Sequence, residues 1–256
     1  MIERHDEAHV AVLRMNRPKR RNALSNALIE ALLSALAEVD ADAEVRAVVL
    51  TGAGKAFCAG GDLADGLSGG GGFVESHRGR GRFAELMAAI PRMATPVIAA
   101  VNGVAMGGGC GLVSACDLAV AAEDAKLGTP EIKLGLFPWI ILAALQRDIG
   151  RKKLLELVLT GKSLSAVEAR EMGLVNQVCR PGEAVQAAVA LAGVIASRSP
   201  AVVGLGKQAF HQIADLDYEQ ALAYMHGQLS LNLLTEDAME GVGAFLQKRP
   251  PQWKGR

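Results

Sequence analysis

Residues 101–112, VNGVAMGGGCGL, pass from an apolar run into three consecutive glycines and then into a second apolar run. The preceding residues 97–101 have the apolar composition of a short buried strand. Consecutive glycines let backbone N–H groups approach a ligand closely, and a helix that begins there leaves its first N–H groups unpaired. The positive end of the helix dipole then faces outward. We therefore expect a strand, a glycine turn and a helix that begins at the turn.

A second turn of this kind lies upstream in residues 54–63, GKAFCAGGDL, directly after a predicted strand at residues 45–51. If the two turns converge, their N–H groups form an oxyanion hole, in which each donor contributes about 3–4 kcal/mol. The alternative is two tight turns that serve only close packing. Either turn alone leaves these interpretations equally open, whereas the two together favour a functional site.

Short apolar strands are also predicted at residues 9–15 and 118–121, and Ser25 is the predicted N-cap of a helix that runs to about Val39. Strands separated by helices and glycine turns indicate an α/β fold. From about residue 183 the pattern is almost uninterrupted helix. We therefore expect an α/β core over residues 1–195 and a helical C-terminal region over residues 196–256. Its apolar stripe needs a surface to bury against, which either the chain's own body or a second subunit can supply.

The bulk composition excludes several classes of protein. The chain has 256 residues, of which 27 are Lys or Arg and 27 are Asp or Glu, so the formal net charge is zero and nucleic-acid binding is not indicated. The four cysteines lie far apart without neighbouring histidines, which predicts free thiols and no metal site. A polar N-terminus and the lack of a long apolar run predict a cytoplasmic protein without membrane contact. The glycine-rich residues 65–82 are predicted to form a surface loop, which is either a passive segment or a substrate-covering lid.

With both glycine turns in view, the sequence resembles the enoyl-CoA hydratase/isomerase (crotonase) superfamily over nearly its whole length. Ordered segments at family spacing carry the resemblance, at residues 16–18 with 22–24, 57–63, 101–117, 129–135, 159–162 and 169–176. The resemblance implies a spiral of repeated ββα units with a C-terminal helical region that builds trimers, usually paired as hexamers. It also implies an acyl-CoA thioester substrate, and no separate cofactor because coenzyme A is part of that substrate.

The same resemblance assigns the site residues. It implies that the amides of Gly61 and Gly108 bind the thioester oxygen. The positions implied to contact coenzyme A are Lys19, Ala23, Lys55, Ala59, Asp62, Leu63 and Ala64. Phe245 and Lys248 match tail positions that can reach the coenzyme A of a neighbouring subunit.

The carboxylates depart from the family pattern. Family hydratases usually hold the attacking water between two glutamates, of which Glu131 is present and the other position is Gly111. Phe137 and Trp139 replace a glycine-rich stretch and suggest an altered acyl pocket. The leading hypothesis is an enoyl-CoA hydratase with Glu131 as acid and base. An enoyl-CoA isomerase that uses Glu131 as a single proton shuttle is the alternative, and a non-catalytic acyl-CoA-binding protein is the alternative from another class.

Overall fold

The structure is a computed structural model that describes residues 1–62 and 73–256, apart from the side chains of Phe73 and Ser76. Its larger sheet has the strand order β1-β2-β3-β5-β7-β10, in which β1 and β2 are antiparallel and the other pairs are parallel. The bounds of these strands are β1 Ile2–Glu7, β2 Val10–Met15, β3 Ala47–Gly52, β5 Val97–Val101, β7 Leu118–Ala122 and β10 Gln177–Cys179.

A smaller sheet has the order β4-β6-β8-β9. Its strands are β4 Ala56–Cys58, β6 Val104–Met106, β8 Lys126–Gly128 and β9 Ser163–Ser165. Strands β3, β5 and β7 of the larger sheet are each followed directly along the chain by a strand of the smaller sheet, and helices α3 and α4 follow the first two pairs. The predicted α/β fold of repeated ββα units is therefore confirmed.

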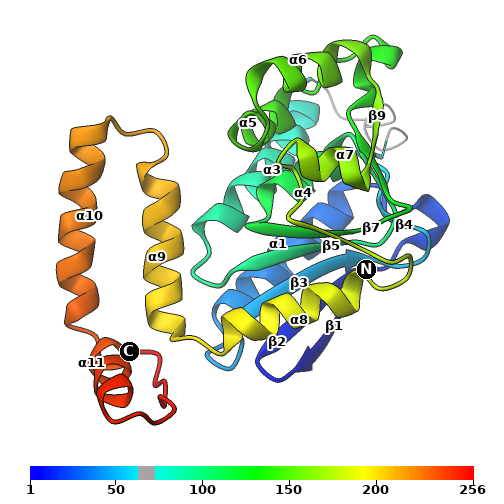
Figure 1. The fold of residues 1–256 in the computed structure, drawn as a ribbon. Coiled ribbons are helices and arrows are strands. Elements are labelled where there is room, and N and C mark those ends of the chain that lie inside the picture. The colour runs from blue at the N-terminus through cyan, green and yellow to red at the C-terminus, as the bar shows by residue number, and fades with distance from the viewer. Residues whose placement is uncertain (63–72) are drawn as a thin grey trace.

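Helices cover both faces of the larger sheet (Figure 1). The helices of the body are α1 Asn26–Asp40, α3 Phe73–Arg92, α4 Gly108–Ala115, α5 Trp139–Asp148, α6 Arg151–Thr160, α7 Ala166–Glu171 and α8 Ala184–Ala196, with 3-10 helices η1 Pro18–Arg20 and η2 Pro130–Leu134. Alternation along the strands separates two cores. Val49 and Ile98 face α8, whereas Leu50 and Ala99 face the main core on the opposite side. Ser25 caps α1 as predicted, and its Oγ accepts a hydrogen bond from the N–H of Leu28 at 3.2 Å.

The prediction of a surface loop over residues 65–82 is wrong for its second half. Residues 63–72 lie outside the described residues, but Gly79 and Gly81 belong to α3. Glycine disfavours a helix interior by about 1 kcal/mol, so tertiary contacts outweigh that local cost. Further along α3, Leu86 and Ile90 are buried in the main core, and Arg82 forms an ion pair with Glu30 of α1.

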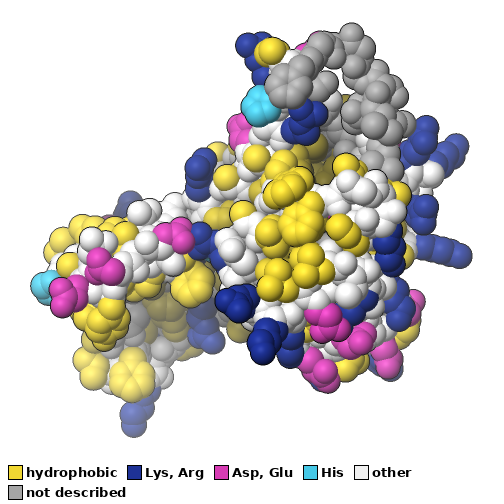
Figure 2. All heavy atoms as spheres, turned by 90° about the horizontal axis from the view of Figure 1, so that it is seen from above, with side chains coloured by type: hydrophobic (Ala, Val, Ile, Leu, Met, Phe, Trp, Pro, Cys, Tyr) yellow, Lys and Arg dark blue, Asp and Glu magenta, His cyan; other side chains and the backbone are white. Residues whose placement is uncertain are grey.

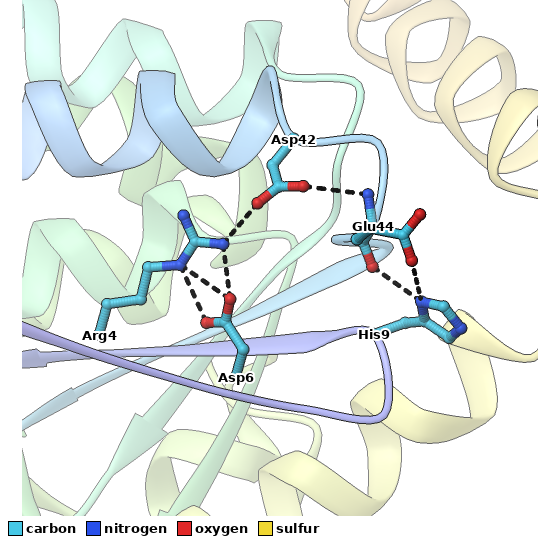
Figure 3. A network of polar contacts seen from close by, with 5 residues as sticks. All are labelled: Arg4, Asp6, His9, Asp42 and Glu44. Carbon is cyan, nitrogen blue, oxygen red and sulfur yellow. Dashed lines mark hydrogen bonds and ion pairs between the residues drawn. The ribbon is translucent and has the colours of Figure 1, made fainter.

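The edge strand β1 is fastened by a network of polar contacts (Figure 3). Arg4 pairs with both Asp6 and Asp42, and Nδ1 of His9 lies 2.8 Å from the carbonyl oxygen of Glu44. The network ties the β1–β2 hairpin to the connection between α1 and β3. Charged side chains on an edge strand oppose pairing with another chain.

The last three helices form an arm beside the body (Figure 1). They are α9 Pro200–Ile213, α10 Tyr218–Leu233 and α11 Glu236–Leu246. No residue of α10 is buried, and apolar side chains are exposed along α10 and α11, including Leu222, Leu229, Val242 and Phe245. Figure 2 shows hydrophobic side chains both on the arm and on the upper side of the body.

Within the described chain, no helix by itself has the length and apolar character needed to cross a membrane. Among the described helices, α8 and α9 reach that length and apolar character only when the two are taken together. These two helices are bent by 106° relative to one another.

Candidate active site

The first glycine turn is held in place by the segment before α1. The N–H of Leu24 donates to the carbonyl oxygen of Gly60 at 2.8 Å, and the N–H of Asp62 donates to the carbonyl oxygen of Leu24 at 3.0 Å. Gly60 has a φ of +103°, which L side chains rarely adopt, so glycine is required there. These two bonds use the residues on either side of Gly61. The N–H of Gly61 itself donates to no acceptor within the described part of the chain.

Asn22 connects the segment before α1 to the residues that lead into the first glycine turn. Its side chain is completely buried, and its Oδ1 accepts a hydrogen bond from the N–H of Arg17 at 2.9 Å. Its Nδ2 donates to the carbonyl oxygens of Ala53 and Ala56 at 3.0 and 2.8 Å. Asn22 also has a φ of 55°, a left-handed conformation that asparagine tolerates better than most residues. Sequence reasoning used this asparagine only as part of a family segment and missed its role as the clamp of the first turn.

The second glycine turn begins α4. Gly107 is the N-cap with a φ of 53°, and its N–H donates to the carbonyl oxygen of Gly128 at 2.8 Å. Gly108 is the first helical residue, so its N–H has no partner inside the helix and none elsewhere among the described residues. A Cβ on Gly109 would lie 2.2 Å from the carbonyl oxygen of Cys58, so glycine is needed for α4 to approach β4 this closely.

The structure brings the two turns together. A Cβ placed on Gly108 would lie 3.6 Å from the nitrogen of Gly61, and one placed on Gly60 would lie 3.6 Å from the nitrogen of Gly108. The two unpaired amides therefore lie close together, one from each turn. Such a pair can bind one negatively charged oxygen.

Glu131 brings a carboxyl group to the second turn from η2. Its Oε1 lies 2.9 Å from the position that a Cβ on Gly107 would occupy. Its Oε2 is buried and has no hydrogen-bond partner among the described residues. Burial raises the pKa of this carboxyl above its ordinary value. A desolvated carboxyl with a raised pKa beside two free amides is an arrangement typical of acid–base catalysis.

The cysteines near the turns are poor candidates for a nucleophile. Cys58 and Cys110 are buried free thiols, as predicted. Burial raises the pKa of each to about 12, so both stay protonated at neutral pH. Glu131 is therefore the stronger candidate for proton transfer at this site.

The positions expected to contact coenzyme A lie around the first turn. Lys19 and Lys55 are both exposed. The turns that carry them are neighbours, since a Cβ on Gly54 would lie 3.2 Å from Cβ of Pro18. Ala23 and Ala59 are half-buried beside them. Leu63 and Ala64 lie outside the described residues.

Asp62 forms an ion pair with Arg17 at 3.2 Å, and Arg17 also donates to the carbonyl oxygen of Ala23 at 2.7 Å. Arg17 thus connects both sides of the first turn. Sequence reasoning used Arg17 only as part of a family segment, because nothing in its spacing reveals a contact with a residue 45 positions later.

The expected acyl-pocket aromatics are not equally placed. The rings of Phe137 and Trp139 are in contact, with centroids 5.0 Å apart. Phe137 packs against the main core, whereas Trp139 is 77% exposed. The side chains of Leu24 and Phe83 border the second turn, because a Cβ on Gly108 would lie 3.2 Å from Leu24 and 3.3 Å from Phe83. No local signal could have identified Phe83, which reaches the site only through the packing of α3.

The tail positions Phe245 and Lys248 lie at the end of the arm. Phe245 is 82% exposed on α11, and Lys248 follows the helix with a φ of 54°. Both are available to a neighbouring molecule.

Comparison with known proteins gives a consistent result. Residues 5–256 match the family model described as enoyl-CoA hydratase/isomerase. The short-chain-enoyl-CoA hydratase of Clostridium acetobutylicum is 36% identical over 250 residues, which cover 95% of this chain and 93% of that protein. The crystal structure of an enoyl-CoA hydratase from Mycobacterium smegmatis is 40% identical, with a TM-score of 0.94 and 98% of each chain covered. That of an enoyl-CoA hydratase from Bacillus anthracis is 37% identical, with a TM-score of 0.94, and covers 100% of this chain and 99% of that one.

Proposed function

The chain belongs to the enoyl-CoA hydratase/isomerase family, and on this premise we propose that it is an enoyl-CoA hydratase, which adds water to a 2-enoyl-CoA. The observation that carries the proposal is the carboxyl of Glu131, desolvated beside the paired free amides of Gly61 and Gly108. Full-length relatives named as enoyl-CoA hydratases support it.

In the proposed reaction, the thioester oxygen accepts hydrogen bonds from the N–H groups of Gly61 and Gly108. Glu131 takes a proton from water while the water oxygen bonds to the β-carbon. The electron pair of the double bond moves to the thioester oxygen and forms an enolate, which the two amides stabilise. The protonated Glu131 then returns its proton to the α-carbon, which completes a 3-hydroxyacyl-CoA.

Glu131 can serve both steps because burial raises its pKa towards the working pH. A raised pKa makes the carboxylate a stronger base towards water, and its protonated form is still acidic enough to protonate the carbon of an enolate. This need for a base also argues against a purely acyl-CoA-binding protein. A binder gains nothing from the cost of burying Oε2 of Glu131 without a partner.

Coenzyme A is proposed to contact Lys19, Ala23, Lys55, Ala59 and Asp62, and also Leu63 and Ala64, which lie outside the described residues. The exposed ammonium groups of Lys19 and Lys55 suit the phosphates of the nucleotide part. Phe137 and Trp139 are proposed to border the acyl group. No cofactor other than the substrate's own coenzyme A enters this reaction.

The experiment offers the purified protein a 2-enoyl-CoA and a 3-enoyl-CoA separately and follows each product by chromatography. Water addition to the first supports a hydratase, and turnover of the second alone moves the assignment to an isomerase. Glu131→Gln should reduce turnover on the order of 10²- to 10⁴-fold, whereas Glu123→Gln, which changes an exposed carboxylate, should not. Binding of acyl-CoA without turnover of either substrate would favour the non-catalytic alternative.

The isomerase remains the second candidate because position 111 carries no carboxylate. One carboxyl suffices to move a proton from one carbon of an acyl chain to another, with the enolate held by the same two amides.

We also propose that residues 1–195 form the catalytic core and that residues 196–256 assemble the protein into a homotrimer or a dimer of trimers. The proposal is supported by the exposed apolar side chains of α10 and α11 and by the lack of any buried residue in α10. A single chain leaves these apolar faces in water, which is unusual for a stable monomer. A cytoplasmic location stays a prediction.

A further inference from the structure

Position 111 is a glycine because a side chain there would have no room. It lies buried in α4, and its φ is outside the left-handed region that favours glycine. A Cβ on Gly111 would nevertheless lie 2.2 Å from Cγ2 and 2.5 Å from Cβ of Ile141, which is 2% exposed on α5. The Cβ of Ile141 cannot swing away, since it is bonded to the backbone. The volume that a side chain at position 111 would need is therefore filled by Ile141 and is closed to substrate.

Ile141 and Glu131 approach α4 at neighbouring points. Glu131 lies against Gly107, the N-cap, and Ile141 lies against Gly111, one helical turn later. The N–H of Gly111 donates to the carbonyl oxygen of Gly107 at 3.0 Å, so the two positions are rigidly connected. An apolar side chain thus lies against α4 one turn beyond the residue that the proposed base approaches.

We infer that Ile141 occupies the place of a second acid–base side chain and thereby fixes the site in a form with one carboxylate. The inference rests on the proposed function for its catalytic part and on packing alone for its structural part. With Ile141 in place, a glutamate at position 111 has no room, so Glu131 must both accept and return the proton. Ile141 is accordingly a specificity-determining residue, because it decides which acid–base chemistry the two glycine turns can support.

The packing part is tested by adding a methyl group at position 111 of α4 and by removing the side chain at position 141 of α5. Gly111→Ala should lower the thermal midpoint by about 5 °C or more, because overpacking a core is destabilising. Ile141→Gly alone is also destabilising, because it leaves a cavity in the core, so the test is the coupling between the two positions. Gly111→Ala should lower the midpoint less in the Ile141→Gly background than in the wild type, since the nearest remaining atom, Cα of Ile141, would lie 3.5 Å from the new Cβ. In an Ile140→Ala background, at the neighbouring half-buried position, Gly111→Ala should lower it as much as in the wild type. An unchanged midpoint in Gly111→Ala, or an equal loss in both backgrounds, would overturn the inference.

The catalytic part is tested by pH profiles of kcat/KM for 2-enoyl-CoA hydration. Gly111→Glu combined with Ile141→Gly should hydrate about 10-fold faster than Ile141→Gly alone and should add a second limb at higher pH. A double variant no faster than Ile141→Gly, or a Gly111→Glu single variant as stable and active as the double variant, would overturn it. If the wild type hydrates nothing, the proposed function fails while the thermal test of packing stands.

Discussion

At the scale of single residues, Glu131 links chemistry to stability. Its carboxyl lies beside Gly107 with one oxygen buried and unpartnered, and desolvation raises its pKa. The native state therefore holds a proton at Glu131 over a pH range in which the unfolded chain has lost it. Stability from this group is fully present below the unfolded pKa and is lost as pH rises through the folded pKa.

We expect hydratase activity to rise with pH over that same window, because the base must be ionised. Glu131→Gln should reduce kcat on the order of 10²- to 10⁴-fold. The variant should also be no less stable than the wild type above the raised pKa, because no charge is then buried. Thermal unfolding and steady-state rates measured from acid to neutral pH test both statements. A Gln variant that becomes less stable than the wild type as pH rises would contradict the burial of charge.

Asn22 offers a second test at this scale. The test concerns the stability of the first glycine turn and not catalysis. Asn22→Ala removes three hydrogen bonds and places alanine at a φ of 55°. Each buried carbonyl left unpaired costs about 1–3 kcal/mol. Asn22→Gly loses the same bonds without the backbone strain, so it should be about 1 kcal/mol more stable than the alanine variant. Urea unfolding of both variants measures the difference, and equal stability would show that φ at this position carries no strain.

At the scale of elements, a buried cation on α9, Lys207, helps to fix the arm to the body, beside the contact of His211 with Asp117. Nζ of Lys207 on α9 lies 2.8 Å from Oδ2 of Asp117 and donates to the carbonyl oxygens of Ile90 and Thr95 at 2.9 Å each. The Lys207 side chain is only 7% exposed. Asp117 also accepts a hydrogen bond from the N–H of Val97 at 2.7 Å, at the start of β5. Lys207 thus joins the ends of α3 and α4 to the first helix of the arm.

Lys207→Met should destabilise the protein by about 3–5 kcal/mol, because it leaves the carboxylate of Asp117 buried and partly unpaired. Denaturant unfolding measures the change, and the control is Arg147→Met. Arg147 pairs with Asp215 beyond the end of α9 at 2.7 Å, but both side chains are exposed, so its loss should cost less than about 1 kcal/mol. Comparable losses in the two variants would show that Lys207 has no special role in holding the arm.

At the scale of the whole molecule, the arm exposes apolar surface that the single chain does not cover. Leu222 and Leu229 lie two turns apart on α10 and are both exposed. The double variant Leu222→Glu/Leu229→Glu should have a smaller molar mass than the wild type in light scattering, because charges at an apolar interface oppose association. Ser230→Glu, an exposed polar position on the same helix, is the control. An unchanged mass in the double variant would exclude this face as the oligomer interface.

Much of the fold and part of the site follow from local sequence. The buried strands, the Ser25 cap and the two glycine turns were predicted because strand alternation and glycine runs are local properties. The helix over Gly79 and Gly81 was missed, because its stability comes from Arg82, Leu86 and Ile90 contacting other elements. The role of Arg17 and the position of Phe83 were missed for the same reason.

By itself the sequence determined that two glycine turns and Glu131 are present and that position 111 has no side chain. Only the tertiary structure decided why that glycine is there. Ile141, 30 residues later, fills the volume beside it, and such steric exclusion depends on how α4 and α5 pack. The residue type at a position is known from the sequence, but the space available to its side chain is set by elements distant in the chain.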